Sequence, residues 1–154
     1  MKKLLLLLLI APVLGFSQNL VFIGENSYPS SKVLVFENKY DDVEISFIRD
    51  EDNIKVYLLT NYIYDYQKPS VSDKLILYLN DGNVITSNKP DITDYVDKNC
   101  VSIYPLTNDD ISKLTKSDIN TIRYTIVTSS TYENEARTAK NTKLGTYEII
   151  KDIL

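Results

Sequence analysis

The chain has 154 residues, of which 17 are lysine or arginine, 21 are aspartate or glutamate, one is cysteine and none is histidine. Without histidine there is no imidazole for a Ser-His-Asp triad, a Cys-His pair or a His-ligated metal site, and a single cysteine excludes zinc ribbons and iron–sulfur clusters. The negative charge balance, with no cluster of lysine or arginine, predicts that nucleic acid is not a partner.

The N-terminus has the three parts of a cleavable signal peptide. Lys2 and Lys3 precede an apolar run over residues 4–14, and Gly15 and Ser17 supply small residues before a cut after Ser17. A retained membrane anchor is the alternative, but a bilayer core needs about 20 apolar residues and this run has 11. We therefore expect residues 1–17 to be removed, with no stable membrane insertion of the remainder.

Residues 18–154 are expected to form one β-rich domain. Loss of Lys2 and Lys3 lowers the basic residues from 17 to 15 against 21 acidic ones, which gives the 137 remaining residues a net charge of −6. Cys100 has no partner for an intramolecular disulfide, so the core alone must stabilise the fold, and we expect this thiol to be buried as a small apolar side chain.

Short apolar segments of two kinds predict the strands. Residues 43–47 and 122–126 alternate apolar and polar side chains, which is typical of a half-buried strand. Three further runs are apolar on both faces, as in strands covered on two sides, and weaker candidates complete the set. The two-sided runs are residues 33–36, 56–59 and 75–79, and the weaker candidates are residues 20–23, 84–86 and 100–104.

Turn residues predict how the strands connect. Asp81-Gly82 between two apolar runs indicates a tight hairpin with positive φ at both positions, and residues 50–53 indicate a second hairpin tip. The polar stretches 87–98 and 132–143 are interpreted as surface loops. The spacing favours an antiparallel β-sandwich or open barrel of about seven to nine strands.

Two short helices are predicted. Thr107 is a suitable N-cap, Asp109 and Asp110 place negative charge in the first turn, and the helix is expected near residues 108–115. At the C-terminus Tyr147 and Ile150 begin an apolar stripe at helical spacing, so a helix is favoured there over a final strand.

Two segments carry a resemblance. Residues 15–18, Gly-Phe-Ser-Gln, resemble the end of flavobacterial signal peptides, and residues 106–114 followed by 119–124 look like a helix-then-strand module of small uncharacterised secreted proteins of flavobacterial type. The resemblance implies export to the periplasm or the exterior of a Gram-negative cell and a β-rich fold. It implies no activity, so it transfers no functional residues to this chain.

Carboxylates are the remaining chemistry for an enzyme. A glycosidase needs two carboxylates across a cleft, and the sequence offers Asp41/Asp42, Asp50/Asp52 and Asp109/Asp110. The first two pairs lie at predicted turns and the third caps a helix, so we nominate no catalytic residue. The acidic turn at residues 50–53 lacks the glycine of a calcium-binding EF-hand loop, and no phosphate-binding glycine motif is present, so no metal or cofactor is expected.

A tyrosine stripe is the most suggestive surface feature. Tyr62, Tyr64 and Tyr66 recur at every second position, so an extended chain directs them to one face, where they suit a protein or glycan ligand. The alternative is that the rings cover the core at a sheet rim. We favour a non-enzymatic, exported protein- or glycan-binding module over a structural or inhibitory protein of the cell envelope, and over a carboxylate-based hydrolase.

Overall fold

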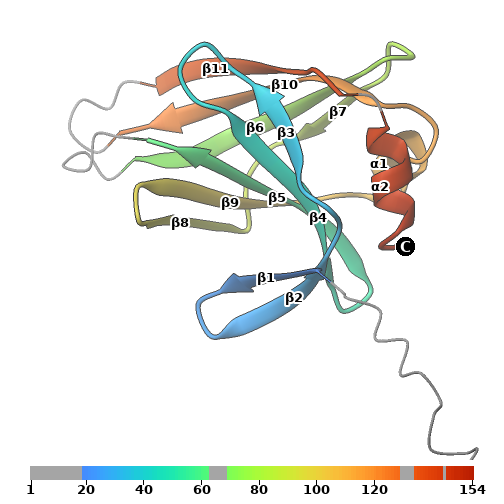
Figure 1. Ribbon diagram of the computed structural model, residues 1–154, viewed down its shortest axis with the longest axis horizontal. Helices are drawn as coiled ribbons and strands as arrows, with labels where there is room; N and C mark the ends of the chain where they lie inside the picture. Colours follow the sequence, from blue (N-terminus) through green and yellow to red (C-terminus); the bar gives the residue numbers. More distant parts are fainter. Residues whose placement is uncertain (1–18, 63–68, 129–133, 144) are drawn as a thin grey trace, which may run out of the picture.

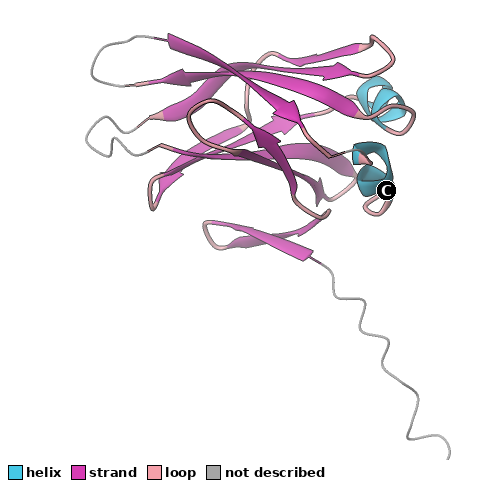
Figure 2. Cartoon of the chain, turned by 45° about the horizontal axis from the view of Figure 1, so that its top comes forward, coloured by secondary structure: helices cyan, strands magenta, loops and turns pink. Residues whose placement is uncertain are grey.

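The computed structural model describes residues 19–62, 69–128, 134–143 and 145–154, and these are mainly β (Figures 1 and 2). They form eleven strands and two short helices. In chain order the elements are β1 Asn19–Ile23, β2 Asn26–Ser30, β3 Leu34–Glu37, β4 Val43–Asp50, β5 Asn53–Asn61, β6 Ser70–Leu79, β7 Val84–Ser87, β8 Ile92–Val96, β9 Asn99–Pro105, α1 Asn108–Leu114, β10 Ile119–Val127, β11 Asn134–Asn141 and α2 Thr146–Lys151.

All eleven strands belong to one antiparallel sheet. Its main path runs β7-β6-β10-β11-β3-β4-β5-β9-β8, so the strand order differs from the chain order at several points. The β1–β2 hairpin branches off this path, because β2 pairs with β4 through the single pair Ser30–Ile48. Figure 1 shows the consequence: the hairpin stands away from the body of the sheet, and both helices lie at the opposite end of the body from the β8–β9 turn.

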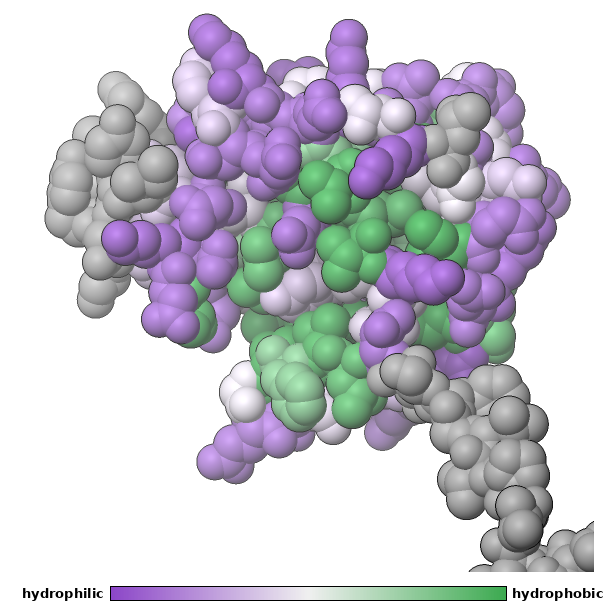
Figure 3. Space-filling view, in the orientation of Figure 1, coloured by the Kyte–Doolittle hydropathy of each residue, from purple (hydrophilic) through white to green (hydrophobic). Residues whose placement is uncertain are grey.

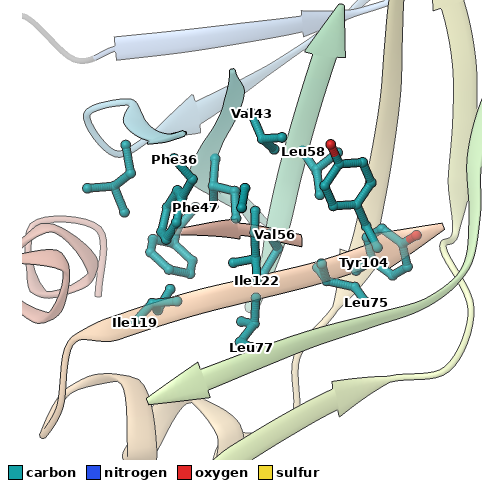
Figure 4. Packing of buried hydrophobic residues seen from close by; sticks show 14 of the residues in the cluster. Phe36, Val43, Phe47, Val56, Leu58, Leu75, Leu77, Tyr104, Ile119 and Ile122 are labelled. Atoms are coloured by element: carbon teal, nitrogen blue, oxygen red, sulfur yellow. The ribbon is translucent and has the colours of Figure 1, made fainter. Parts of the chain in front are cut away.

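The sheet curls so that its inner face encloses one apolar core. Side chains from β3, β4, β5, β6, β9 and β10 converge there, and ten of them are labelled in Figure 4. Alternation along each strand supplies these residues, as in β5, where every second residue is buried. The largest fully buried side chains include Tyr104, Tyr124, Phe36 and Phe47.

The curled sheet closes through side chains. The Ser102 hydroxyl on β9 donates to the Val71 carbonyl on β6 at 2.5 Å, and the Cys100 thiol donates to the Pro69 carbonyl at 3.5 Å. Among the described residues no backbone ladder joins β6 to β9, so the structure is an open barrel with a seam between these two strands. These side chains satisfy carbonyl groups that a closed barrel would pair with backbone N–H groups.

The helices cover the end of the barrel that lies next to the β6–β7 turn and the start of β10. The Thr107 side chain accepts from the Asp110 amide while the Asp110 carboxylate accepts from the Thr107 amide, which is a capping box at the start of α1. Asp118, just before β10, accepts hydrogen bonds from Gly145, Thr146 and Tyr147 and so fixes the start of α2. The chain end is held by Arg49, which donates to the Ile153 carbonyl.

The predicted fold class is confirmed. The strands nominated from periodicity are all present, as are both helices and the hairpin at residues 50–53. Cys100 is free and buried, as expected. Within the described residues, neither α1 nor α2 is long and apolar enough to cross a bilayer. Residues 1–17 lie outside the described part, so the signal peptide and its cleavage stay predictions.

The prediction was wrong in the number of strands and in the backbone of one turn. There are eleven strands instead of seven to nine, because residues 92–96 and 134–141, interpreted as loops, form β8 and β11, and because residues 26–30 form β2. β8 is an edge strand and β11 buries only Arg137 and Ala139, so neither shows an apolar pattern. In the β6–β7 turn only Gly82 has positive φ, since the loop spans four residues instead of two.

A phenylalanine pair tests the core. We expect Phe47→Ala to lower the free energy of unfolding by about 3–5 kcal/mol, because Phe47 is fully buried and its removal leaves a cavity. Phe22→Ala is the matched control: its ring is 71 % exposed, so the change should stay within about 0.5 kcal/mol. Urea unfolding of both variants measures the difference, and equal losses would contradict this assignment of the core.

Candidate functional site

The structure describes one of the three nominated tyrosines. Tyr62 directly follows β5, and its side chain is only 8 % exposed and belongs to the apolar core. This burial agrees with the alternative interpretation, in which the ring covers the core. Tyr64 and Tyr66 lie outside the described residues, so a surface made by all three rings stays a prediction. The Tyr95 hydroxyl donates to the Tyr62 carbonyl at 3.2 Å, which links the tyrosine to β8.

The Tyr62 ring lies beside the charged side chain of Arg137, which sequence reasoning did not identify. Arg137 on β11 points to the inner face and is 8 % exposed. Its guanidinium carbon lies 5.4 Å from the centre of the Tyr62 ring and 5.0 Å from that of Tyr40, so both rings face the cation. Arg137 Nη2 donates to Glu135 at 3.0 Å, and Nη1 lies 3.9 Å from the Asp41 carboxylate.

The inner face around Arg137 holds polar atoms without partners. Arg137 Nε and Nη1 and the Thr60 hydroxyl are shielded from solvent and have no hydrogen-bond partner. The Tyr124 hydroxyl accepts from Asn38 Nδ2 at 3.3 Å. Leaving a buried polar group unpaired costs about 1–3 kcal/mol, more for a charged one, so this end of the barrel is maintained at the expense of stability.

Burial also controls the ionisation of the neighbouring side chains. It raises the pKa of the Cys100 thiol to about 12, and the positive charge of Arg137 offsets only part of that rise. Burial likewise raises the pKa of Tyr124, where the hydroxyl's polar neighbours and Arg137 act in the opposite direction. All of these groups therefore stay protonated at neutral pH, and Cys100 is a poor nucleophile there.

An open groove lies on the outer face of the sheet. It is bounded by β1 with its turn on one side and by β8 and its turn on the other, and it has a volume of about 440 Å³. Its walls and floor come from β1, β5, β8, β9 and the adjoining turns. The lining residues are Phe22, Ile23, Gly24, Tyr57, Leu59, Asp94, Val96, Asp97, Asn99 and Val101.

Strand register explains why apolar residues meet in this groove. Leu59 pairs with Val101, and Val101 pairs with Asp94 on the edge strand, so these side chains share the outer face. Tyr57 lies two residues before Leu59 on the same face. The apolar lip is exposed, since the Phe22 ring is 71 % and Val96 51 % accessible. Figure 3 shows hydrophobic residues on the β1–β2 hairpin, below a larger hydrophobic area on the body.

The charged side chains that line the groove are acidic. Among the described residues these are Asp94 and Asp97, and the lining there includes no lysine or arginine. Glu44 pairs with Leu59 across β4 and β5 and therefore lies on the same face. Burial raises the pKa of the Tyr57 hydroxyl, and the nearby negative charge of Glu44 raises it further. The groove thus combines an apolar floor with an acidic rim.

The acidic pairs that were weighed as hydrolytic carboxylates, and not nominated, have structural partners. Asp41 lies near Arg137, Asp50 forms an ion pair with Lys55 at 2.9 Å, and Asp109 forms one with Lys113 at 2.6 Å. Asp110 belongs to the capping box. In the described ranges, no three acidic or cysteine side chains are grouped so that they could hold a metal ion.

Comparison of the chain with protein-family models, with curated proteins and with solved structures found no match.

The buried thiol makes stability depend on alkaline pH. Between pH 9 and about 12 the unfolded chain releases the Cys100 proton while the folded chain retains it, so the free energy of unfolding falls as the pH rises through this window. We expect Cys100→Ala to reduce this fall between pH 9 and 10, because tyrosine ionisation affects both proteins alike and cancels in the difference between them. Urea midpoints at pH 7, 9 and 10 check it, and parallel pH profiles for the two proteins would contradict it.

Proposed function

We propose that this chain is an exported, non-enzymatic module that binds an extended segment of another protein in the groove between β1 and β8. The observation that carries the proposal is the apolar floor of Tyr57, Leu59 and Val101 beneath the exposed Phe22 ring. Exposed aromatic rings beside an apolar floor are typical of recognition surfaces. Export rests on the predicted signal peptide.

The charge of the rim selects the chemistry of the partner. Asp94 and Asp97 favour a segment that carries lysine or arginine next to an apolar side chain, because opposite charges across an interface favour encounter and register. A second copy of this chain fits less well, since the net charge is negative and the exposed hairpin offers Glu25 as its charged residue. The proposed partner is therefore a basic, apolar stretch of a different protein.

The size of the groove sets the extent of the contact. A volume of about 440 Å³ lies within the range of about 300–1,000 Å³ that is typical of ligand pockets, and it holds a few side chains. A stable protein complex usually buries about 800 Å² on each partner, which is more than a few side chains can cover. The groove therefore holds the anchoring side chains of a short peptide. Binding of this kind is transient, whereas a structural protein of the cell envelope would keep a fixed partner.

Synthetic peptides test the proposal. We expect a labelled peptide with alternating phenylalanine and lysine to bind, and versions with glutamate for lysine or serine for phenylalanine to bind at least about tenfold more weakly. Phe22→Ala should weaken binding by about tenfold through loss of apolar contact. Asp94→Asn combined with Asp97→Asn should remove most of the salt dependence. Fluorescence anisotropy measures each affinity.

Val84→Ala supplies the matched control, because Val84 is an exposed apolar residue on β7, outside the groove. It should leave peptide affinity unchanged. Equal binding of the lysine and glutamate peptides, or wild-type affinity in Phe22→Ala, would overturn the proposal. A response to oligosaccharides that Phe22→Ala abolishes, with no response to any peptide, would assign the groove to a glycan instead.

A further inference from the structure

A second site follows from Arg137, which lies on the inner face and takes no part in the groove. Three of its five N–H donors, one on Nε and two on Nη1, make no hydrogen bond, and the Asp41 carboxylate lies 3.9 Å from Nη1, beyond hydrogen-bond distance. Arg137 is the charged member of the buried polar residues in the described part of the chain. A buried guanidinium with unused donors is a binding group for a ligand that brings oxygen acceptors.

The surrounding charges decide which ligand fits. Arg137 and Lys39 are balanced by Asp41 and Glu135, and Lys39 lies 5.3 Å from the same Tyr40 ring that Arg137 faces. An anionic ligand would gain no net attraction and would meet two carboxylates. A cationic ligand would likewise meet Arg137 and Lys39. A neutral ligand with both donors and acceptors meets neither difficulty.

Acceptors for such a ligand lie beside the guanidinium. The Asp41 and Glu135 side chains are 25 % and 46 % exposed, so their oxygens remain accessible while their other contacts hold Arg137. A hydroxyl group both donates and accepts, and it can therefore bond to a carboxylate and to Arg137 at once. Adjacent hydroxyls on a sugar ring match this alternation of carboxylate and guanidinium.

Tyr40 provides the access and the stacking surface. Arg137 Nε and Nη1 are shielded from solvent, so a ligand reaches them when a covering side chain moves. Tyr62 is held in the core, and its backbone accepts from Tyr95 and donates to Lys98. Tyr40 is 59 % exposed on the loop between β3 and β4, where its amide is bonded locally to Asn38.

We propose that this end of the barrel binds a neutral saccharide unit, with Arg137 donating to its hydroxyl oxygens, Asp41 and Glu135 accepting from its hydroxyl groups, and the Tyr40 ring stacking on its apolar face. The site lies on the inner face and its rim, whereas the groove lies on the outer face, so the two proposals stand or fall separately. A protein with both sites would join a glycan to a protein segment.

Cellobiose, maltose and lactose serve as neutral probes, with glucuronic acid as the anionic one. The chain has no tryptophan, so tyrosine fluorescence and the Nε–H resonance of Arg137 report binding directly. We expect at least one neutral disaccharide to shift both signals and glucuronic acid to shift neither. Tyr40→Ala should weaken the neutral response by about tenfold, the loss of one stacking contact.

Two further variants make the test specific. Tyr147→Ala is the matched control, because that ring also faces a cation, Lys151 at 4.6 Å, but lies on α2, and its response should equal wild type. Asp41→Asn removes one carboxylate and should allow glucuronic acid to bind. No response to any of the three neutral sugars would overturn the proposal, as would a full response in Tyr40→Ala or tighter binding of glucuronic acid than of neutral sugar by the wild type.

Discussion

Because the chain has a single cysteine, no disulfide within it can stabilise the fold, and the curled sheet depends on the apolar side chains packed across its interior. That packing requires the strands to alternate buried and exposed residues and the sheet to curl around them. The curl brings β6 against β9, each the neighbour of an edge strand, and there Ser102 and Cys100 donate to backbone carbonyls. The groove and the Arg137 site are both consequences of this curled sheet, one outside it and one within.

The interior changes in character along the barrel. Near the helices it is apolar, with Phe47, Ile119 and Ile150 fully or almost fully buried. Toward the β8–β9 turn it holds Tyr124, whose hydroxyl accepts from Asn38, together with Thr60 and Arg137, which have buried polar atoms without a hydrogen bond. A protein that needed only stability would fill this end with apolar side chains, because replacing both partners of a buried polar contact is often neutral or favourable. The polar end is therefore the part of the core that function best explains.

Periodicity predicted the fold well where large side chains alternate. β4, β10 and the hairpin at residues 50–53 follow directly from Val43, Ile45 and Phe47, from their counterparts on β10 and from the acidic turn. β11 was not predicted because its inward positions carry an arginine and an alanine, which give no apolar pattern. β8 was not predicted because an edge strand exposes most of its side chains, so its composition resembles that of a loop.

The candidate sites were only partly predictable. Residues 56–59 are apolar on both faces, and the outward pair Tyr57 and Leu59 becomes the groove floor, so a signal was present but was assigned to a covered strand. Tyr62 was singled out, but its role beside Arg137 depends on pairing between strands far apart in the chain. The sequence places Glu135, Arg137 and Ala139 at every second position, as on one face of a strand. It cannot show that Tyr124 pairs with Arg137 across the β10–β11 ladder.

The seam between β6 and β9 has a mechanical consequence. In a closed barrel, strand number and shear together set the circumference. Here two side-chain hydrogen bonds stand where a closed barrel would have a backbone ladder. Separating β6 from β9 would break these two bonds and no backbone ladder of the described residues, so this seam is the line along which the curled sheet opens at the lowest cost.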